Sequence, residues 1–130
     1  MLNTLWKDAP NGIPGNDDLG AMSSWYVWAA MGVYPGIPGR AELFLTAPLF
    51  TRIVIHRGNE KPVVIMAPQA GPSAPYVQSL RVDGKAMTRA WLPQSFVAAG
   101  GTLDFVVGPN PSMSWGSAPE DIPPSFGPRR

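Results

Sequence analysis

GIPGNDDLG at residues 12–20, followed by AMSSWYVWAAMGV at residues 21–33, is the stretch that decides the fold. Glycine permits positive φ and proline fixes φ, so residues 12–15 predict a rigid turn. Met22, Trp25 and Ala29 then recur at three- and four-residue spacing, which predicts a helix over 21–33. Asp17 and Asp18 therefore stand where a helix begins, and its free N–H groups and dipole favour ionised carboxylates there.

The two aspartates allow a structural and a chemical interpretation. In the first, Asp18 caps the helix, Asp17 is its solvated neighbour, and the aromatic side chains of the helix are core. In the second, a carboxylate that is kept ionised is suited to act as a general base or a cation ligand, and unsuited to act as a general acid. The two aspartates are consecutive and share one environment, so they cannot supply both the acid and the base of a hydrolase. Other carboxyls qualify by residue type only, namely Glu42, Glu60 and Glu120.

Composition narrows the class of protein. The chain has 130 residues, of which 45% are hydrophobic and 15% charged, and a formal net charge of +1, which indicates a single folded domain. Basic and aromatic residues do not interleave, so nucleic acid is not an expected partner, and the basic pair Arg129-Arg130 is expected to be a solvated tail. No apolar run is long enough for a membrane span. Residues 1–8 lack the pattern of a signal peptide, so the localisation stays open.

The chain has no cysteine and one histidine, His56. Disulfides, thiolate metal sites and multi-histidine metal sites are therefore excluded, and His56 is expected to be a solvated residue at the end of a strand. Trp91 and Trp115 are expected in loops. They are suited either to stack against a sugar or to anchor their loops on the body of the protein.

Beyond residue 40 the hydrophobic period changes from 3.6 to 2. Alternating runs predict five or six short strands, and Asp83-Gly84 predicts a hairpin turn between two of them. The expected strands are 42–46, 51–56, 62–67, 76–82, 85–88 and 102–107, with one or two helical turns at 94–100. The predicted class is α+β in two layers, with the aromatic helix packed on a mostly antiparallel sheet. We expect a turn-and-helix segment over 1–39, a β-rich part over 40–108 and an extended Pro/Gly-rich tail over 109–130.

Residues 12–27, continuing through 30–35 and 38–39, resemble the signature of glycoside hydrolase family 92. Later segments, among them APLF at 47–50, IVIH at 53–56, GGTLDF at 100–105 and WG at 115–116, are similar to the C-terminal end of such enzymes. The resemblance covers about residues 6–117. It is long and specific at the front and looser in the β-rich part.

The resemblance implies an inverting, calcium-dependent exo-α-mannosidase, as known from bacteria and active on terminal α-mannosides or high-mannose N-glycans. It implies Asp18 as the general base, Asp17 as its support, and Asn16 and Gly15 as substrate-binding residues. In the family, this turn lies beside a calcium ion that contacts the mannose hydroxyls. Full-length members are usually secreted, periplasmic or surface-attached.

Family members are several-fold longer, with a β-sandwich ahead of an (α/α)6 barrel, so the resemblance implies that the 1–39 segment is the end of that barrel. The general acid and most calcium ligands are then expected upstream, and no metal ligand is assigned within this chain. Whether the polypeptide is an enzyme by itself stays open, and it is expected to be inactive alone. The expected partners are the missing N-terminal part or, through the exposed aromatic helix, a second copy. The alternative function is a non-catalytic carbohydrate-binding or structural β-rich module.

Overall fold

The structure is a computed structural model and describes residues 2–124, so the predicted role of Arg129-Arg130 lies outside the described residues. Its helices are α1 (Leu2–Leu5), the 3-10 helix η1 (Asp18–Gly20), α2 (Ala21–Met31), α3 (Gln94–Ala99) and the 3-10 helix η2 (Pro119–Asp121). Its strands are β1 (Val33–Tyr34), β2 (Leu43–Leu45), β3 (Arg52–Arg57), β4 (Glu60–Met66), β5 (Tyr76–Val82), β6 (Lys85–Met87), β7 (Trp91–Leu92) and β8 (Gly101–Gly108). The predicted α+β class is confirmed.

The strands form two sheets within the described residues, where the sequence predicted one sheet of five or six strands. One sheet has the order β1-β2-β7, and the other has the order β3-β4-β8-β5-β6. All pairs are antiparallel except β4 with β8, which run parallel with Ile65 opposite Leu103. The additional strands are the two-residue β1 and β7, which both pair with β2. Phe44 lies opposite Tyr34, which is near in sequence, and opposite Trp91, which is far from it.

The hydrophobic core lies on the five-stranded sheet and against the smaller one. Ile65, Leu80, Leu103 and Phe105 are almost completely buried, and they come from its three central strands. Leu92 of the smaller sheet belongs to the same cluster. Because apolar side chains from both sheets meet there, the strands form one body (residues 33–124).

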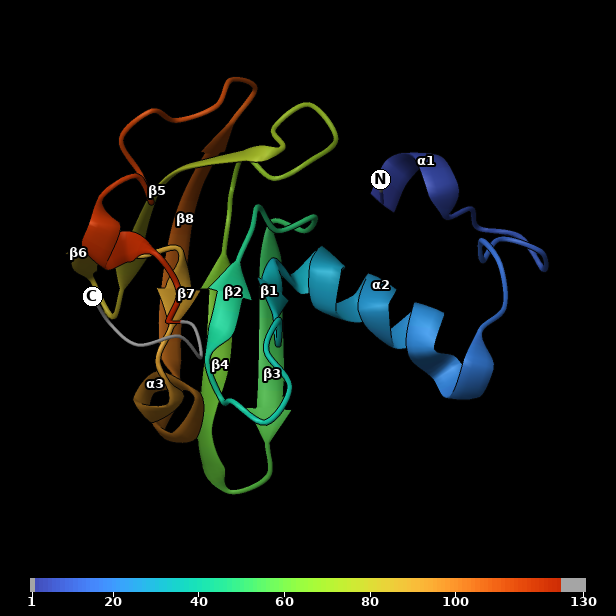
Figure 1. The fold of residues 1–130 in the computed structure, drawn as a ribbon, viewed down its shortest axis with the longest axis horizontal. Coiled ribbons are helices and arrows are strands. Elements are labelled where there is room, and N and C mark those ends of the chain that lie inside the picture. The colour runs from blue at the N-terminus through green and yellow to red at the C-terminus, as the bar shows by residue number, and fades with distance from the viewer. Residues whose placement is uncertain (1, 125–130) are drawn as a thin grey trace.

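Helix α2 leaves this body as an arm (residues 2–31), which Figure 1 shows extending away from the strands, with α1 drawn above α2. The end of α2 is fixed to the body: Trp28 and Met31 pack against the core, and the Leu49 amide donates to the Ala30 carbonyl at 2.9 Å. Gly32 ends the helix at φ +76°, and a Cβ there would lie 2.8 Å from the Pro48 nitrogen. The joint between arm and body therefore needs glycine for two reasons, a left-handed backbone and a close approach.

The C-terminal segment, expected as an extended Pro/Gly-rich tail, is bound to the body through Trp115 and Asp121. Asp121 is 1% exposed and accepts a 2.6 Å hydrogen bond from the Thr88 hydroxyl. Its carbonyl accepts from the Ala90 amide at 3.2 Å. Trp115 packs against the core and donates from its indole nitrogen to the Met87 carbonyl at 3.3 Å. Among the described residues, no helix is long and apolar enough to cross a membrane.

Candidate functional site

The turn that carries the two aspartates is built by backbone contacts between residues 7 and 20. The Lys7 amide donates to the Gly12 carbonyl at 3.0 Å, and the Gly12 amide donates to the Ala9 carbonyl at 2.9 Å. A Cβ on Gly12 would lie 1.8 Å from the Lys7 carbonyl oxygen, so this close approach excludes any side chain there. Trp6 stacks on Trp25 with a centroid distance of 4.8 Å, which ties the turn to α2.

Asp17 caps the first turn of α2 from outside the helix. Its carboxylate accepts the Ser23 amide at 2.9 Å through Oδ1, and it accepts the Ser23 hydroxyl through Oδ2. Both carboxylate oxygens thus accept a hydrogen bond. The bond from the Ser23 amide satisfies an N–H group that the helix start would otherwise leave without a partner. The Ser23 hydroxyl first, and then its amide, hold the pKa of Asp17 below its usual value of 3.8.

The environment of Asp18 differs from that of Asp17. Its side chain is exposed, and no side-chain hydrogen bond or ion pair of Asp18 is found within residues 2–124. The structural interpretation had Asp18 as the cap and Asp17 as its solvated neighbour, and the structure reverses these two roles. The N-cap residue of α2 itself is Gly20, in a left-handed conformation at φ +79°.

Leu19, directly after Asp18, has an unusual conformation. Its φ is +53° and its side chain is fully exposed, although leucine disfavours both the left-handed region and contact with water. Asn16 and Gly15 are exposed on the same turn, and Gly15 has φ +76°. The turn therefore presents an unpaired carboxylate, an amide side chain and a strained apolar residue together.

The other carboxyls that the sequence offered do not complete an acid–base pair in this chain. Glu42 accepts two hydrogen bonds from Arg40, at 3.0 and 2.5 Å, and this pairing lowers its pKa to about 2, far from a proton donor at neutral pH. Glu60 is paired with Arg57 at 3.3 Å, and Glu120 is an exposed residue of η2.

The aromatic residues expected in loops are anchors. Trp91 lies in β7 with its indole nitrogen buried and with the Arg89 guanidinium 4.8 Å above its ring. Trp115 is held by its bond to Met87, as described above. Both side chains are half-buried. His56 is exposed on β3, as expected.

The described residues hold no cluster of charged or imidazole side chains that could bind a metal ion: no group of three or more Asp, Glu, His or Cys side chains within residues 2–124 is suited to one. Calcium takes about six to eight oxygen ligands. Asp18 and the Asn16 amide oxygen could contribute ligands only to a site whose remainder comes from elsewhere.

Comparison with known proteins identifies the family. The model of the glycosyl hydrolase family 92 catalytic domain matches residues 1–109, which is most of the chain. The chain belongs to glycoside hydrolase family 92. The stretch from Gly12 to Val33 that decides the fold, and the aspartate turn within it, thus lie inside the matched region of this family.

The chain is similar to three larger proteins, two of which are solved mannosidases. A secreted glycosidase of Arthroderma benhamiae is 37% identical over 129 residues, which are 97% of this chain and 16% of that protein. An α-mannosidase of Bacteroides thetaiotaomicron, solved with mannoimidazole, superposes with a TM-score of 0.91 at 29% identity, covering 96% of this chain and 16% of the enzyme. An inverting mannosidase of the same bacterium gives 0.88 at 31% identity, with 96% and 17% covered. The chain thus spans about a sixth of the length of the relatives that it matches.

Sequence reasoning found the aspartate turn but did not single out Ser23, whose amide and hydroxyl bind Asp17. Asp17 and Ser23 are six residues apart, on either side of the left-handed residues Leu19 and Gly20. No helix or strand period brings residues at that spacing together, so the sequence carries no signal for this contact.

Proposed function

We propose that this chain is the part of a family 92 α-mannosidase that supplies the general base, Asp18, for hydrolysis of terminal α-mannosides such as those of high-mannose N-glycans. The proposal is carried by the different hydrogen bonding of the two aspartates. Ser23 donates to both carboxylate oxygens of Asp17, whereas the Asp18 carboxylate is exposed and has no hydrogen bond or ion pair among the described residues. Further support comes from solved relatives that are α-mannosidases, one of them inverting.

The chemistry follows from an inverting mechanism. Asp18 takes a proton from a water molecule, whose oxygen attacks the anomeric carbon on the face opposite the leaving oxygen. The bond from that carbon to the leaving oxygen breaks while a second carboxyl, roughly 6.5–9.5 Å from the base, donates a proton to it. Asp17 holds the turn through Ser23, and in this proposal Asn16 and Gly15 contact the sugar.

In this proposal the proton donor comes from the rest of the enzyme; within this chain, the low pKa of Glu42, about 2, and the ion pair of Glu60 make both poor proton donors. A base without an acid or a closed substrate pocket gives little rate. We therefore expect the chain alone to show no measurable turnover of α-mannosides. Calcium, in this proposal, binds in the intact enzyme with most of its ligands from the remaining part.

The test is a hybrid in which residues 1–130 replace the matching segment of the inverting Bacteroides thetaiotaomicron mannosidase. Asp18→Asn is expected to reduce kcat by about 10²–10⁴-fold, the usual contribution of a general base, while Asp17→Asn costs much less. Added azide should restore part of the activity of an Asp18→Gly hybrid, because a small anion can replace the activated water. A folded hybrid that Asp18→Asn leaves active, or that Asp17→Asn impairs more, contradicts the assignment.

A further inference from the structure

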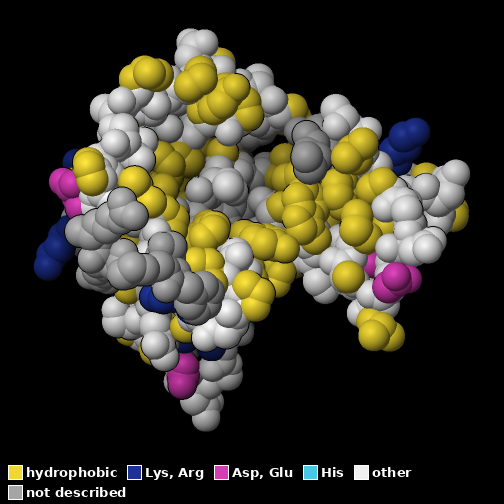
Figure 2. All heavy atoms as spheres, viewed as in Figure 1, with side chains coloured by type: hydrophobic (Ala, Val, Ile, Leu, Met, Phe, Trp, Pro, Cys, Tyr) yellow, Lys and Arg dark blue, Asp and Glu magenta, His cyan; other side chains and the backbone are white. Residues whose placement is uncertain are grey.

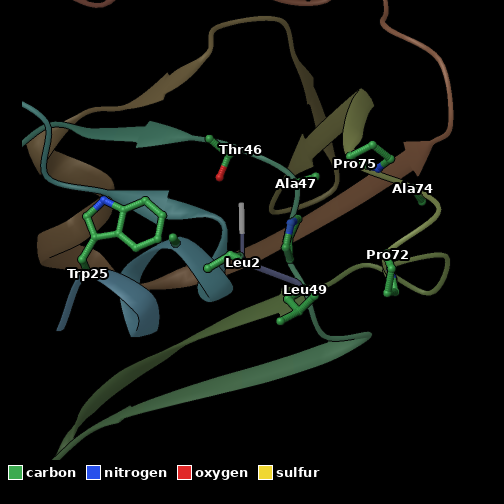
Figure 3. A pocket seen from close by; sticks show the side chains of 11 residues that line it. Leu2, Trp25, Thr46, Ala47, Leu49, Pro72, Ala74 and Pro75 are labelled. Carbon is green, nitrogen blue, oxygen red and sulfur yellow. The ribbon is translucent and has the colours of Figure 1, made fainter. Parts of the chain in front are cut away.

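Apolar side chains surround the hollow between the arm and the body, as Figure 2 shows. A pocket of about 320 Å³ lies there, and Figure 3 shows Leu2 and Trp25 on its arm side with Leu49 and Pro72 on its body side. Because the arm and the body each supply one side, the shape of this pocket depends on how the arm is held. A cavity whose walls belong to one packed unit is better suited to bind a small ligand, since its shape is fixed before the ligand arrives.

Such a cavity lies between the two sheets of the body and has a volume of about 170 Å³. Side chains from all three strands of the smaller sheet line it on one side, and side chains of β3, β4 and β8 line it on the other. Trp28, which packs against the core from the end of α2, and two residues of α3 complete the lining. Figure 1 shows β2 overlapping β4, with α3 near the lower end of β8. Ile65, Leu92 and Leu103 are 0–1% exposed, so the walls of the cavity belong to the packed core.

The lining of this cavity is aliphatic or aromatic except at Arg57, whose guanidinium is already bonded. Its Nε and Nη2 donate to the Lys61 carbonyl at 3.0 and 2.5 Å, and its Nη1 donates to the Val97 carbonyl at 2.7 Å. Nη1 also lies 3.3 Å from the Glu60 carboxylate. A buried water molecule needs about two to four polar partners, and a polar ligand needs partners of its own, so the cavity suits neither.

We propose that this cavity is a binding site for one small, uncharged apolar molecule of about the size of benzene. An apolar cavity of about 150 Å³ in another protein stays free of water and binds benzene or xenon, so a volume of 170 Å³ is large enough for such a ligand. Protein interiors are otherwise close-packed, and side chains that face a void lose dispersion contacts. A ligand of this size restores those contacts and brings no polar group that would lack a partner.

The cavity is separate from the aspartate turn. Asp18 precedes the first turn of α2, whereas Trp28 lies toward the other end of the helix, and the rise from Ala21 to Trp28 alone is about 10 Å. The cavity is therefore a second site in the chain. The inference goes beyond the proposed function, because it requires neither a role of Asp18 nor a bound mannoside.

The first test titrates benzene into the chain of residues 1–130 and follows the melting temperature and, by NMR, the methyl resonances of Ile65, Leu92 and Leu103. Because benzene binds the folded state, the melting temperature should rise with benzene concentration, and the methyl shifts should saturate at one ligand per chain. Phenol has the same ring and one hydroxyl, for which the cavity offers no free partner, so it should bind at least tenfold more weakly. Methyl shifts that do not saturate, or phenol binding as tight as benzene binding, overturn the proposal.

The second test fills the cavity from Val63 and uses the neighbouring valine as its control. Val63 and Val64 are both half-buried in β4, and of these two only Val63 lines the cavity, since successive side chains of a strand point to opposite faces. Val63→Phe should weaken benzene binding at least tenfold, because the larger side chain occupies part of the volume, whereas Val64→Phe should leave it unchanged. Equal effects of the two substitutions contradict the assigned site. The comparison of benzene with phenol needs no variant, so it stands even where a substitution impairs folding.

The hybrid enzyme described above extends the test to a longer chain. Benzene should give the same saturable methyl shifts there, because both walls of the cavity come from residues 33–103 and Trp28. Binding to the chain of residues 1–130 that is lost in the folded hybrid would mean that other parts of the enzyme fill the cavity, which overturns the proposal. Asp18→Asn should leave benzene binding unchanged, so a failed cavity site and a failed general base give different results.

Discussion

Ser23 and Asp17 share two hydrogen bonds, and this pair lowers the pKa of Asp17. Ser23→Ala removes the hydroxyl donor and keeps the amide donor, so the pKa of Asp17 should rise toward 3.8. Because the folded-state pKa is depressed, the stabilisation that the pair supplies is complete above the unfolded-state pKa and is lost as pH falls through the folded-state pKa. Carboxyl titration by NMR measures the shift, and urea unfolding across this range measures the loss.

Ser24→Ala is the control for that substitution, since Ser24 is exposed on the same helix and no hydrogen bond of its side chain is found in the described chain. Equal pKa values of Asp17 in the two variants would contradict the assigned pair. The sequence located both aspartates at a helix start because that signal is local. Its structural interpretation gave the cap to Asp18 instead of Asp17, because the choice depends on the path of the chain through Leu19 and Gly20.

At the scale of elements, Gly32 is the joint on which the placement of the arm depends. Gly32→Ala introduces a side chain at φ +76° whose Cβ would lie 2.8 Å from the Thr46 carbonyl oxygen and the Pro48 nitrogen. Gly39→Ala has the same backbone requirement, at φ +78°, with nothing within 4 Å. The Gly39 variant should lose about 1–2 kcal/mol of unfolding free energy from backbone strain, and the Gly32 variant about 1–3 kcal/mol more from overpacking. Denaturant unfolding of both variants separates the effect of backbone strain from the effect of overpacking. Equal losses of unfolding free energy would show that the close approach at Gly32 does not add to the loss.

The segment that ends in η2 is fixed by Asp121. Asp121→Ala removes the bond from the Thr88 hydroxyl and a weaker one from the Ala118 amide at 3.3 Å, both made by a carboxylate that is almost fully buried. We expect a loss of about 1.5–3 kcal/mol in unfolding free energy. Glu120→Ala, one residue earlier and exposed, should stay within about 0.5 kcal/mol. If the two variants unfold alike, the buried carboxylate does not hold the segment.

Local patterns predicted the longer elements well. The expected strands at 76–82 and 102–107 and the helical turns at 94–100 match β5, β8 and α3 within a residue or so. The sequence could not predict β1 and β7, because two-residue strands have no period. It also could not predict that Phe44 pairs with Trp91 in a second sheet, since such pairing is decided by tertiary packing.

At the scale of the whole molecule, the body has its own hydrophobic core and the arm does not. The body has a core with side chains of 0–2% exposure, whereas α2 has eleven residues, contacts the body mainly through its last turn, and is at the length where an isolated helix is marginal. Local stability should therefore be divided between them, because segments with few buried contacts open at low free energy.

Hydrogen exchange on the chain alone should show this division. Amides of β8 around Leu103 and Phe105 should exchange slowest, and amides in the first two turns of α2 should exchange faster by orders of magnitude. Adding the remaining part of the enzyme should slow amide exchange in α2, because the arm gains contacts, and should leave amide exchange in β8 unchanged. Helix α3 is the internal control: it is short like the exposed part of α2, but the Arg57 guanidinium binds the carbonyls of Val97 and Ala98 at 2.7 and 3.1 Å, so its exchange should not respond to the partner. Protection of α2 equal to that of β8 in the isolated chain would mean that the arm is stable by itself and needs no partner to complete it.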